Sequence, residues 1–420
     1  MNVLSLFDGM SCGRLALLRA GVKIDHYYAS EIKPFAVKFV KDNFPDTIQI
    51  GDVTKVSYKY GTNKDENGNE FTDYYLDTEN GVIHSGKIDI LIGGSPCQDF
   101  STAKAFNNPN KYGLEGDKSR LFYEYLRILK EIKDQHEVYF LLENVKMKKE
   151  SEKELNQYMG LDSIHLNSKL VSYQLRDRLY WTNIPNVVLP TDREINFQDF
   201  KDKDLSRCKE AKLNKTPSRE KMWGKGVRAY KFSCYNVTND TKVHCLTRKQ
   251  DRCPNSGLIE FEDFCRFLTR RELEGAQTVP YGYTDGLSYA NMQDVCGDGW
   301  TVDAIAHIFS FLPSSEKDFK EQNDENKAFD ILRTTIKNLW EDETKFVRGK
   351  NTKGKLNIEK YNTGYLVYEY INDTKVNLKL NYSFEEMVED VCTRLYPDYV
   401  NQIKVEVFPQ VTNKLIRKWV

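Results

Sequence analysis

Cys97 is the residue of this sequence best suited to nucleophilic chemistry. It lies in the segment GGSPCQDFS, directly after a short apolar stretch. Glycine and proline together fix a tight turn, which presents a side chain at the end of a strand. A lone cysteine is most often a packed small hydrophobe. The rigid and weakly apolar surroundings of Cys97 favour a reactive thiolate instead.

A carboxylate and two guanidinium groups follow in the next apolar segments. Glu143 closes the segment YFLLE and is expected to lie beside the thiol. The segment QLRDR, residues 174–178, alternates as a strand does, so Gln174, Arg176 and Arg178 should share one side. Two arginines on one side of a strand form either a salt-bridged face or a reader of anions and base edges. The pattern alone leaves both interpretations open.

Three acidic residues follow three successive apolar stretches near the start of the chain. Asp8 lies in a glycine-containing turn ahead of a predicted helix, whose first N–H groups can bind a carboxylate. Glu31 offers two acceptors for ribose hydroxyls, and Asp52 offers one for an adenine amino group, with the N–H of Val53 beside it. One such acid is more often a cap or a solvated loop end, but three favour an adenosine-like cofactor. Because the sequence has no P-loop motif, a non-phosphorylated adenosine compound is favoured over ATP.

Apolar and amphipathic segments alternate along the first 185 residues and position these groups. This alternation is typical of βαβ units, with a mainly parallel sheet and helices on both faces. The residues suited to chemistry follow predicted strand ends, where open α/β sheets bind ligands. A polar segment at 58–86 is expected to be an inserted hairpin. Strands are predicted at 2–7, 26–30, 48–53, 88–92 and 139–142, and helices at 12–20, 34–43 and 119–133.

The alternation stops after residue 185, and three further parts are expected. Residues 186–285 are irregular and should form a smaller domain. Residues 286–312 contain the helix-forming segment DGWTVDAIAHIFSFL and should return to the first domain. Residues 313–420 should form an α+β unit, either a structural or partner-binding appendage or a contributor to DNA binding. Within these parts, helices are expected at 272–277, 292–295, 298–312, 328–340 and 383–395, and strands within 357–382.

Charge and cysteine content narrow the possible functions only slightly. The net charge is −1, but residues 201–231 hold eleven lysines and arginines against four acids. This basic stretch is either a solvated face or a surface for DNA phosphates. The nine cysteines include no CxxC pair, so most are expected to be free buried thiols. No metal is predicted, and a zinc site remains a weaker alternative because its spacings fit no compact motif. Its ligands would be Cys234, Cys245, Cys253 and Cys265.

Length and composition are typical of a soluble globular protein with two or three domains. The longest apolar runs have the length of strands, which predicts that no segment spans a membrane. The start of the chain lacks the features of a signal peptide. We therefore expect a cytoplasmic protein, with a monomer favoured.

The ordered motifs resemble those of the cytosine-5 DNA methyltransferase family. The chain contains FDG, ASE, GDV, GGSPCQ, LENV, QLRDR and GWTVDAIAHIF in the family's order, over about residues 1–185 and 265–312. Several stretches, such as LFDGMSCG and DRLYWTNIP, look closest to the catalytic domain of the animal de novo enzymes. QLRDR is typical of bacterial enzymes instead. The resemblance implies a Rossmann-like class I S-adenosylmethionine-dependent methyltransferase fold. The Lys-, Asn- and Tyr-rich composition suggests a bacterial or phage origin.

The resemblance implies methylation of cytosine carbon 5 in duplex DNA. Cys97, in a loop with Pro96, would add to carbon 6 of a flipped-out base. Glu143 would bind N3 and the exocyclic amine. Arg178 would bind O2, and Arg176 would support it or the Cys97 loop. S-adenosylmethionine would be the methyl donor. The residues around it would be Phe7, Asp8, Gly9, Met10, Ser11, Glu31, Ile32, Asp52, Val53, Ser95, Pro96, Leu121, Asp298, Gly299 and Trp300.

The partner implied by the resemblance is double-stranded DNA, bound by a target recognition domain at residues 186–285. The biological setting would be restriction-modification, phage protection or solitary DNA methylation. Two alternatives remain, a tRNA cytosine methyltransferase and a catalytically silent DNA-binding regulator. The missing CFT feature disfavours the first, and the intact Cys97, Glu143 and Arg178 set disfavours the second. DNA contacts are expected from Gln98, Ser101, Arg176, Thr247, Arg248, Lys249 and Arg252.

Overall fold

The computed structural model describes two compact units of this chain. The first comprises Met1–Val279 and Gly286–Leu312, and the second comprises Pro280–Asp285 and Pro313–Val420. All the site residues discussed below belong to the first unit. The described residues are 1–65, 68–96, 120–203, 205–217, 236–248 and 256–313, together with the backbone of four strands at 345–347, 355–361, 364–371 and 374–381.

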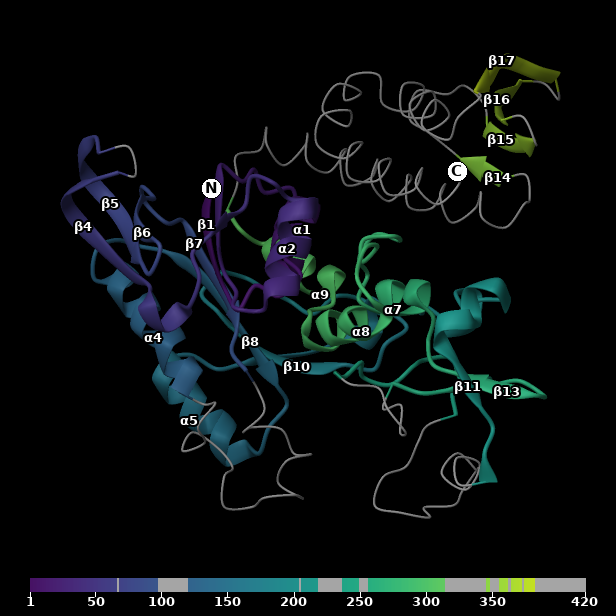
Figure 1. The fold of residues 1–420 in the computed structure, drawn as a ribbon, viewed down its shortest axis with the longest axis horizontal. Coiled ribbons are helices and arrows are strands. Elements are labelled where there is room, and N and C mark those ends of the chain that lie inside the picture. Colours follow the sequence, from purple (N-terminus) through teal and green to yellow (C-terminus); the bar gives the residue numbers. More distant parts are fainter. Residues whose placement is uncertain are drawn as a thin grey trace. The chain divides into compact units, whose positions relative to one another are not determined.

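A seven-stranded sheet runs through the first unit (Figure 1). Its order is β3-β2-β1-β7-β8-β10-β9. The first five strands are parallel, β10 is antiparallel to β8, and β9 at the edge is antiparallel to β10. The α/β fold with a mainly parallel sheet, expected from the alternating pattern, is confirmed. The strands are β1 (Asn2–Leu6), β2 (His26–Ser30), β3 (Ile48–Gln49), β7 (Ile90–Gly94), β8 (Tyr139–Val145), β9 (Ile164–Asn167) and β10 (Asp177–Thr182).

Helices cover both faces of this sheet (Figure 1). Alternate side chains of a strand point to opposite faces, and Leu4 and Leu6 of β1 pack in one cluster with Phe122 and Tyr125 of α4. That cluster excludes water from one face of the sheet and holds the strands in place. One group of helices is α1 (Cys12–Arg19), α2 (Pro34–Asn43) and α9 (Val302–Phe309), and the other is α4 (Arg120–Lys133) and α5 (Lys149–Met159).

The strand order reverses between β1 and β7. The chain moves from β1 to β2 and β3 on one side, whereas β7 and β8 lie on the other side. The loops that leave the carboxyl ends of β1 and β7 therefore turn in opposite directions, which is where open α/β sheets bind ligands. These are the loops that carry Asp8 and Ser95.

The inserted segment is a three-stranded antiparallel sheet rather than the predicted hairpin. Its strands are β4 (Ser57–Lys64), β5 (Glu70–Thr78) and β6 (Gly81–His84). The additional strand forms because Glu79 and Asn80 make a second tight turn after β5, and Gly81, with a φ of 116°, begins β6. The insertion is fixed to α4, since the N–H of Tyr58 donates to Glu131 at 2.8 Å. Part of its predicted turn, residues 66–67, lies outside the described residues.

Residues after β10 form short elements around a buried ion pair. Arg266 and Glu272 are both fully buried, with Nη1 and Oε2 2.6 Å apart. Glu272 also accepts the N–H of Thr269 in a capping box, which fixes the start of α7. A small sheet and α7 are thereby joined. The elements are β11 (Lys212–Asn214), β12 (Ile259–Glu260), β13 (Phe264–Arg266), α7 (Arg270–Ala276) and α8 (Tyr289–Asp298).

The predicted helix over 298–312 is shorter in the structure. α8 extends to Asp298, and α9 begins only at Val302. Gly299 separates the two helices with an extended backbone. Its carbonyl group accepts hydrogen bonds from the side chains of Arg176 and Gln277 instead of from a backbone N–H of a helix.

The second unit contains an antiparallel sheet, as the alternating pattern at 357–382 predicts. Its strands are β14 (Lys345–Val347), β15 (Lys355–Tyr361), β16 (Gly364–Ile371) and β17 (Thr374–Asn381). The predicted helices at 328–340 and 383–395 lie outside the described residues. Among the helices that are described, none has the length and apolar character needed to cross a membrane.

Gly297 offers a test of how the segment at 247–248 packs on α8. A Cβ at this position would overlap the backbone N of Arg248 and lie 2.5 Å from the carbonyl carbon of Thr247. Backbone atoms cannot move aside easily, so Gly297→Ala should lower the free energy of unfolding by about 1–3 kcal/mol in urea denaturation. Gly61→Ala, where a Cβ meets nothing within 4 Å, is the control and should change it by less than about 0.5 kcal/mol. Equal stabilities would contradict the packing described here.

Candidate active site

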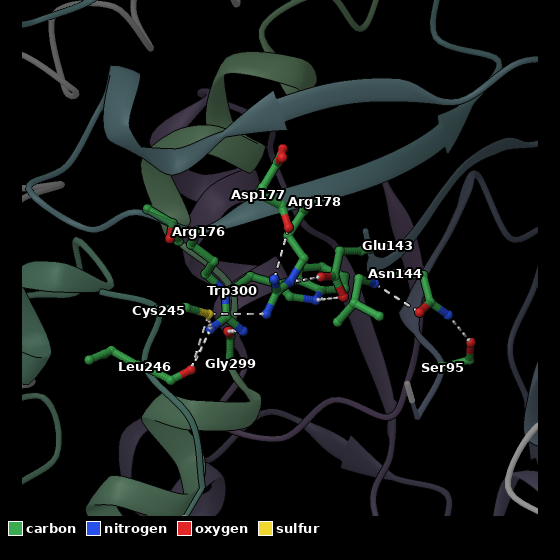
Figure 2. A network of polar contacts seen from close by, with 12 residues as sticks. Ser95, Glu143, Asn144, Arg176, Asp177, Arg178, Cys245, Leu246, Gly299 and Trp300 are labelled. Carbon is green, nitrogen blue, oxygen red and sulfur yellow. Dashed lines mark hydrogen bonds and ion pairs between the residues drawn. The ribbon is translucent and has the colours of Figure 1, made fainter. Parts of the chain in front are cut away.

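The carboxylate of Glu143, near the carboxyl end of β8, is contacted from two directions. Glu143 is 8% exposed, and its Oε1 lies 2.8 Å from Nε of Arg178. Its Oε2 accepts the indole N–H of Trp300 at 3.0 Å. Figure 2 shows both contacts. The ion pair with Arg178 and the hydrogen bond from Trp300 fix the orientation of the carboxylate, which is the requirement for a group that must meet a substrate in one geometry.

The loop after β7 is joined to the same place. Asn144 is fully buried, and its Nδ2 donates to Oγ of Ser95 at 3.1 Å (Figure 2). Gly94 must be a glycine here, because a Cβ would lie 2.8 Å from Nε1 of Trp300 and 2.9 Å from Oε2 of Glu143. Glycine at position 94 therefore lets the Glu143 carboxylate come close to the loop that leads to Cys97. Pro96 ends the described part of this loop, and the predicted nucleophile Cys97 lies outside the described residues.

Arg176 joins three parts of the chain. Its Nη1 donates to the carbonyl of Leu246 at 2.9 Å, and its Nη2 donates to the carbonyls of Gly297 at 3.1 Å and Gly299 at 2.7 Å. Its side chain is only 3% exposed. A direct DNA contact by Arg176 is therefore not supported, because backbone carbonyls occupy its guanidinium. Its place agrees better with the predicted supporting role beside Arg178.

The predicted strand at 174–178 begins later than expected. β10 starts at Asp177, and Gln174 forms an isolated bridge to Val243. Gln174 nevertheless accepts the N–H of Leu246 at 2.9 Å, so it reaches the segment that Arg176 also binds. Gln174, Arg176 and Arg178 were predicted to share one side, and all three contact residues 245–246.

The loop after β1 has an unusual backbone. Phe7 and Ser11, which are not glycines, have φ values of 60° and 55°, and Gly9 has a φ of 60°. Such conformations cost energy and cluster at functional sites. Asp8 stabilises the loop internally, since its carboxylate accepts hydroxyl groups from Ser5, Ser11 and Tyr27. Burial raises the pKa of Asp8 despite these hydroxyl donors.

Glu31 and Asp52 lie at the neighbouring strand ends, as predicted. Glu31 accepts N–H groups from Gly9, Ile32 and Lys33, each at 2.9 Å, which connects the loops after β1 and β2. Oδ1 of Asp52 accepts both the N–H and the hydroxyl of Thr54 at 2.9 Å. Within the described chain, Oδ2 of Asp52 has no hydrogen-bond partner, which leaves one acceptor for a ligand.

The remaining residues predicted around the cofactor occupy different environments. A Cβ on Gly299 would lie 2.7 Å from Cε of the buried Met10, so this turn packs against the loop after β1. Ile32 is 70% exposed beside Glu31, where it can contact a ligand. Val53 is buried, and Leu121 packs against the core cluster from α4.

Asp298 forms ion pairs with residues of two other segments. Its Oδ2 lies 2.6 Å from Nζ of Lys33 and 3.4 Å from Nε of Arg248. Arg248 also pairs with Asp294 at 3.0 Å. Thr247 and Arg248 therefore lie next to the site, whereas Gln98, Ser101, Lys249 and Arg252 lie outside the described residues.

Three features of the site escaped prediction from the sequence. The indole N–H of Trp300 binds Glu143, although Trp300 was expected at the cofactor. Glu79 of the insertion accepts the backbone N–H of Asp52 at 3.1 Å. Cys245 lies between the guanidinium groups of Arg176 and Arg178. Each contact joins distant segments, and no local pattern in the sequence signals it.

The first part of the chain matches a known protein family. Residues 1–161 match the family model for C-5 cytosine-specific DNA methylases. This match confirms the predicted resemblance over these residues. The family that they match uses S-adenosylmethionine as methyl donor.

Relatives come from plants, bacteria and phages. DNA (cytosine-5)-methyltransferase DRM2 of Arabidopsis thaliana is 35% identical over 135 residues, 32% of this chain and 19% of that protein. Type II methyltransferase M.NgoBV of Neisseria gonorrhoeae is 26% identical over 325 residues, 70% of this chain and 67% of that protein. Orphan methyltransferase M.Rho11sI of Bacillus phage rho11s is 28% identical over 231 residues, 51% of this chain and 39% of that protein. The match thus spans less than half of the plant and phage proteins.

Solved structures show the same fold. The Entamoeba histolytica methyltransferase EhMeth superposes with a TM-score of 0.53 at 16% identity, covering 74% of this chain and 97% of that one. The S. pombe Dnmt2 methyltransferase superposes with a TM-score of 0.51, with the same identity and coverage. These likenesses establish the Rossmann-like methyltransferase fold.

The residues at the strand ends fit S-adenosylmethionine. The acceptor Oδ2 of Asp52 suits an adenine amino group, and the exposed Ile32 suits contact with the nucleoside. The strained loop from Phe7 to Ser11 brings backbone close to a ligand at the start of α1.

Asp52→Asn tests this pocket. An amide presents only one carbonyl oxygen, so either Thr54 or the adenine amino group loses its acceptor. We expect S-adenosylmethionine to bind about 10-fold more weakly by calorimetry, as for one unsatisfied polar group. Asp77→Asn in the insertion, where Asp77 pairs with Lys59 on the surface, is the control and should bind normally. Unchanged affinity in Asp52→Asn would place adenine elsewhere.

Trp300→Phe tests the orientation of Glu143. Removing the indole N–H leaves Oε2 without this donor, and a lost hydrogen bond to a charged group lowers kcat by roughly 10- to 100-fold. Phenylalanine keeps an aromatic ring but removes part of the indole volume, so kcat is measured well below the melting temperature of the variant. Tyr60→Phe, on the exposed part of β4, is the control. A variant with normal kcat would show that this hydrogen bond does not position Glu143.

Proposed function

We propose that this protein transfers a methyl group from S-adenosylmethionine to carbon 5 of cytosine in double-stranded DNA. The observation that carries the proposal is the Glu143 carboxylate, oriented by Arg178 and Trp300 at the end of β8. It lies beside Gly94, which begins the loop leading to Cys97. The match of residues 1–161 to the family model supports the same reaction.

The chemistry requires activation of a weak nucleophile. Carbon 5 of cytosine becomes nucleophilic when the Cys97 thiolate forms a bond to carbon 6, which pushes the ring electrons toward carbon 5 and N3. Glu143 binds N3 and the exocyclic amine, and assists protonation of N3 as charge develops. S-adenosylmethionine supplies the electrophilic methyl group. Loss of the carbon 5 proton to a base then breaks the bond from Cys97 to carbon 6 and restores the aromatic ring.

Arg178 has two tasks in this proposal. Its Nε holds Oε1 of Glu143 at 2.8 Å, and its guanidinium binds O2 of the base. One planar group then fixes both the carboxylate and the base edge, which preorganises the charges before reaction. Arg176 supports it by holding the segment at 245–246 and the turn at 297–299 in place.

The substrate is a flipped-out base. Carbons 5 and 6 are covered by stacking in a duplex, so the cytosine must rotate out at a cost of a few kcal/mol. We place the recognition of the surrounding sequence in residues 186–285, where Thr247 and Arg248 approach the site. The protein acts as a monomer in the cytoplasm of a bacterial or phage-infected cell, in restriction-modification, phage protection or solitary methylation.

Trapping on 5-fluorocytosine tests the covalent step. Fluorine at carbon 5 blocks the final elimination, so the enzyme with S-adenosylmethionine should form a duplex-DNA adduct that survives denaturing electrophoresis. Cys97→Ser should form none, and its methyl transfer should fall by at least about 10³-fold, because a neutral hydroxyl is a far weaker nucleophile. Cys208→Ser is the matched control. An adduct with tRNA alone would favour RNA as the substrate, and full activity of Cys97→Ser would refute the mechanism.

A further inference from the structure

A second cysteine lies next to the proposed catalytic groups. Cys245 is half-buried, and its Sγ is 3.5 Å from Nη1 of Arg176 and 3.6 Å from Nη2 of Arg178 (Figure 2). It lies within residues 186–285, the predicted recognition domain. The reaction described above gives this sulfur no task, so its position between two cations needs an explanation.

The charges around the two arginines are unequal. The positive charge of Arg178 is matched by Glu143 at 2.8 Å. Arg176 is 3% exposed, and its guanidinium partners among the described residues are three carbonyl oxygens and the sulfur of Cys245. A buried cation is costly without a compensating negative charge. A thiolate at Cys245 provides that charge and brings the four groups to neutrality. It gives up the thiol's contact with the carbonyl of Leu246 at 3.5 Å and keeps the two contacts from the arginines.

The acid–base behaviour of the thiol agrees with this arrangement. Burial opposes ionisation of Cys245, but the positive charges of Arg178 and Arg176 outweigh it and lower the pKa of the thiol. Cys12 shows the contrast, because burial raises the pKa of its thiol to about 12. The charged groups facing Cys245 are the two arginines, with Glu143 behind Arg178.

We propose that Cys245 is a positioning residue for methyl transfer, whose anionic sulfur holds Arg176 and Arg178 together and thereby sets Arg178 against Glu143. This inference rests on the proposed function, since it assigns Arg178 its place in the reaction. Cys245 acts through the arginines and does not touch the substrate. Because Cys245 contacts both arginines and the carbonyl of Leu246 accepts from Arg176, movement of this segment would change the position of both arginines.

The ionisation of Cys245 can be measured without any methyl transfer. The full-length protein is treated with iodoacetamide over a range of pH, and alkylation of each cysteine peptide is followed by mass spectrometry. We expect the rate for Cys245 to reach half its maximum at lower pH than for free cysteine, whereas Cys12 stays unmodified. Arg176→Met should move the Cys245 midpoint to higher pH. A midpoint equal to or above that of free cysteine would overturn the proposal.

The positioning role is tested by substitution. Cys245→Ser keeps a small polar group but no charge, so we expect kcat to fall roughly tenfold, as for one charge-assisted hydrogen bond. KM for DNA should stay within about twofold, because uniform binding is unaffected. Cys245→Asp restores an anion and should recover part of kcat. Cys208→Ser, which alters a buried cysteine of another segment, should retain full kcat.

The outcomes separate this inference from the proposed function. Normal kcat in Cys245→Ser would overturn the positioning role while leaving methyl transfer intact. A fall in kcat that Cys245→Asp does not relieve, with a raised KM or a lowered melting temperature, would also overturn it and indicate a purely structural role. If the unaltered protein methylates no cytosine, the proposed function fails, and the alkylation midpoint still decides whether Cys245 carries the charge.

Discussion

One carboxylate connects the parts of this site. Glu143 ends a central strand, Arg178 belongs to the neighbouring antiparallel strand, and Trp300 comes from the turn between α8 and α9. These residues are far apart in the sequence, so their contacts form only when the sheet and the closing helix are both in place. The hydrogen bond from Trp300 to the carboxylate is charge-assisted, and such bonds are strong and directional. The geometry of Glu143 therefore depends on the packing of the whole first unit.

The same turn also links the cofactor side to the catalytic side. Gly299 packs against Met10 of the loop after β1, while Arg176 binds the carbonyl of Gly299 from the other direction. S-adenosylmethionine bound at that loop would lie next to the turn that contains Trp300, which orients Glu143. The insertion adds a further constraint, because Glu79 holds the N–H of Asp52. In the proposed reaction, cofactor binding and base activation would therefore depend on the same contacts.

Much of the fold was predictable because the information is local. The apolar runs at 26–30 and the proline-initiated helix at 34–43 match β2 and α2, since alternation and capping are properties of neighbouring residues. Contacts between distant residues were not predictable. The alternation at 174–178 gave the correct side for the arginines but placed the strand too early, because residues 174–176 bind the segments at 245–246 and 297–299 instead of a β ladder. The partnership of Cys245 with two arginines likewise exists only in three dimensions.

The central claim is that the group formed by Glu143, Arg178 and Trp300 serves methylation at carbon 5 of cytosine. Duplex DNA incubated with the protein and S-adenosylmethionine can be digested to nucleosides and analysed by mass spectrometry. The account predicts 5-methyldeoxycytidine as the product of the unaltered protein, and a loss of at least about 10²-fold in Glu143→Gln, which can no longer assist protonation of N3. Methylation of adenine, or undiminished 5-methyldeoxycytidine with Glu143→Gln, would contradict it.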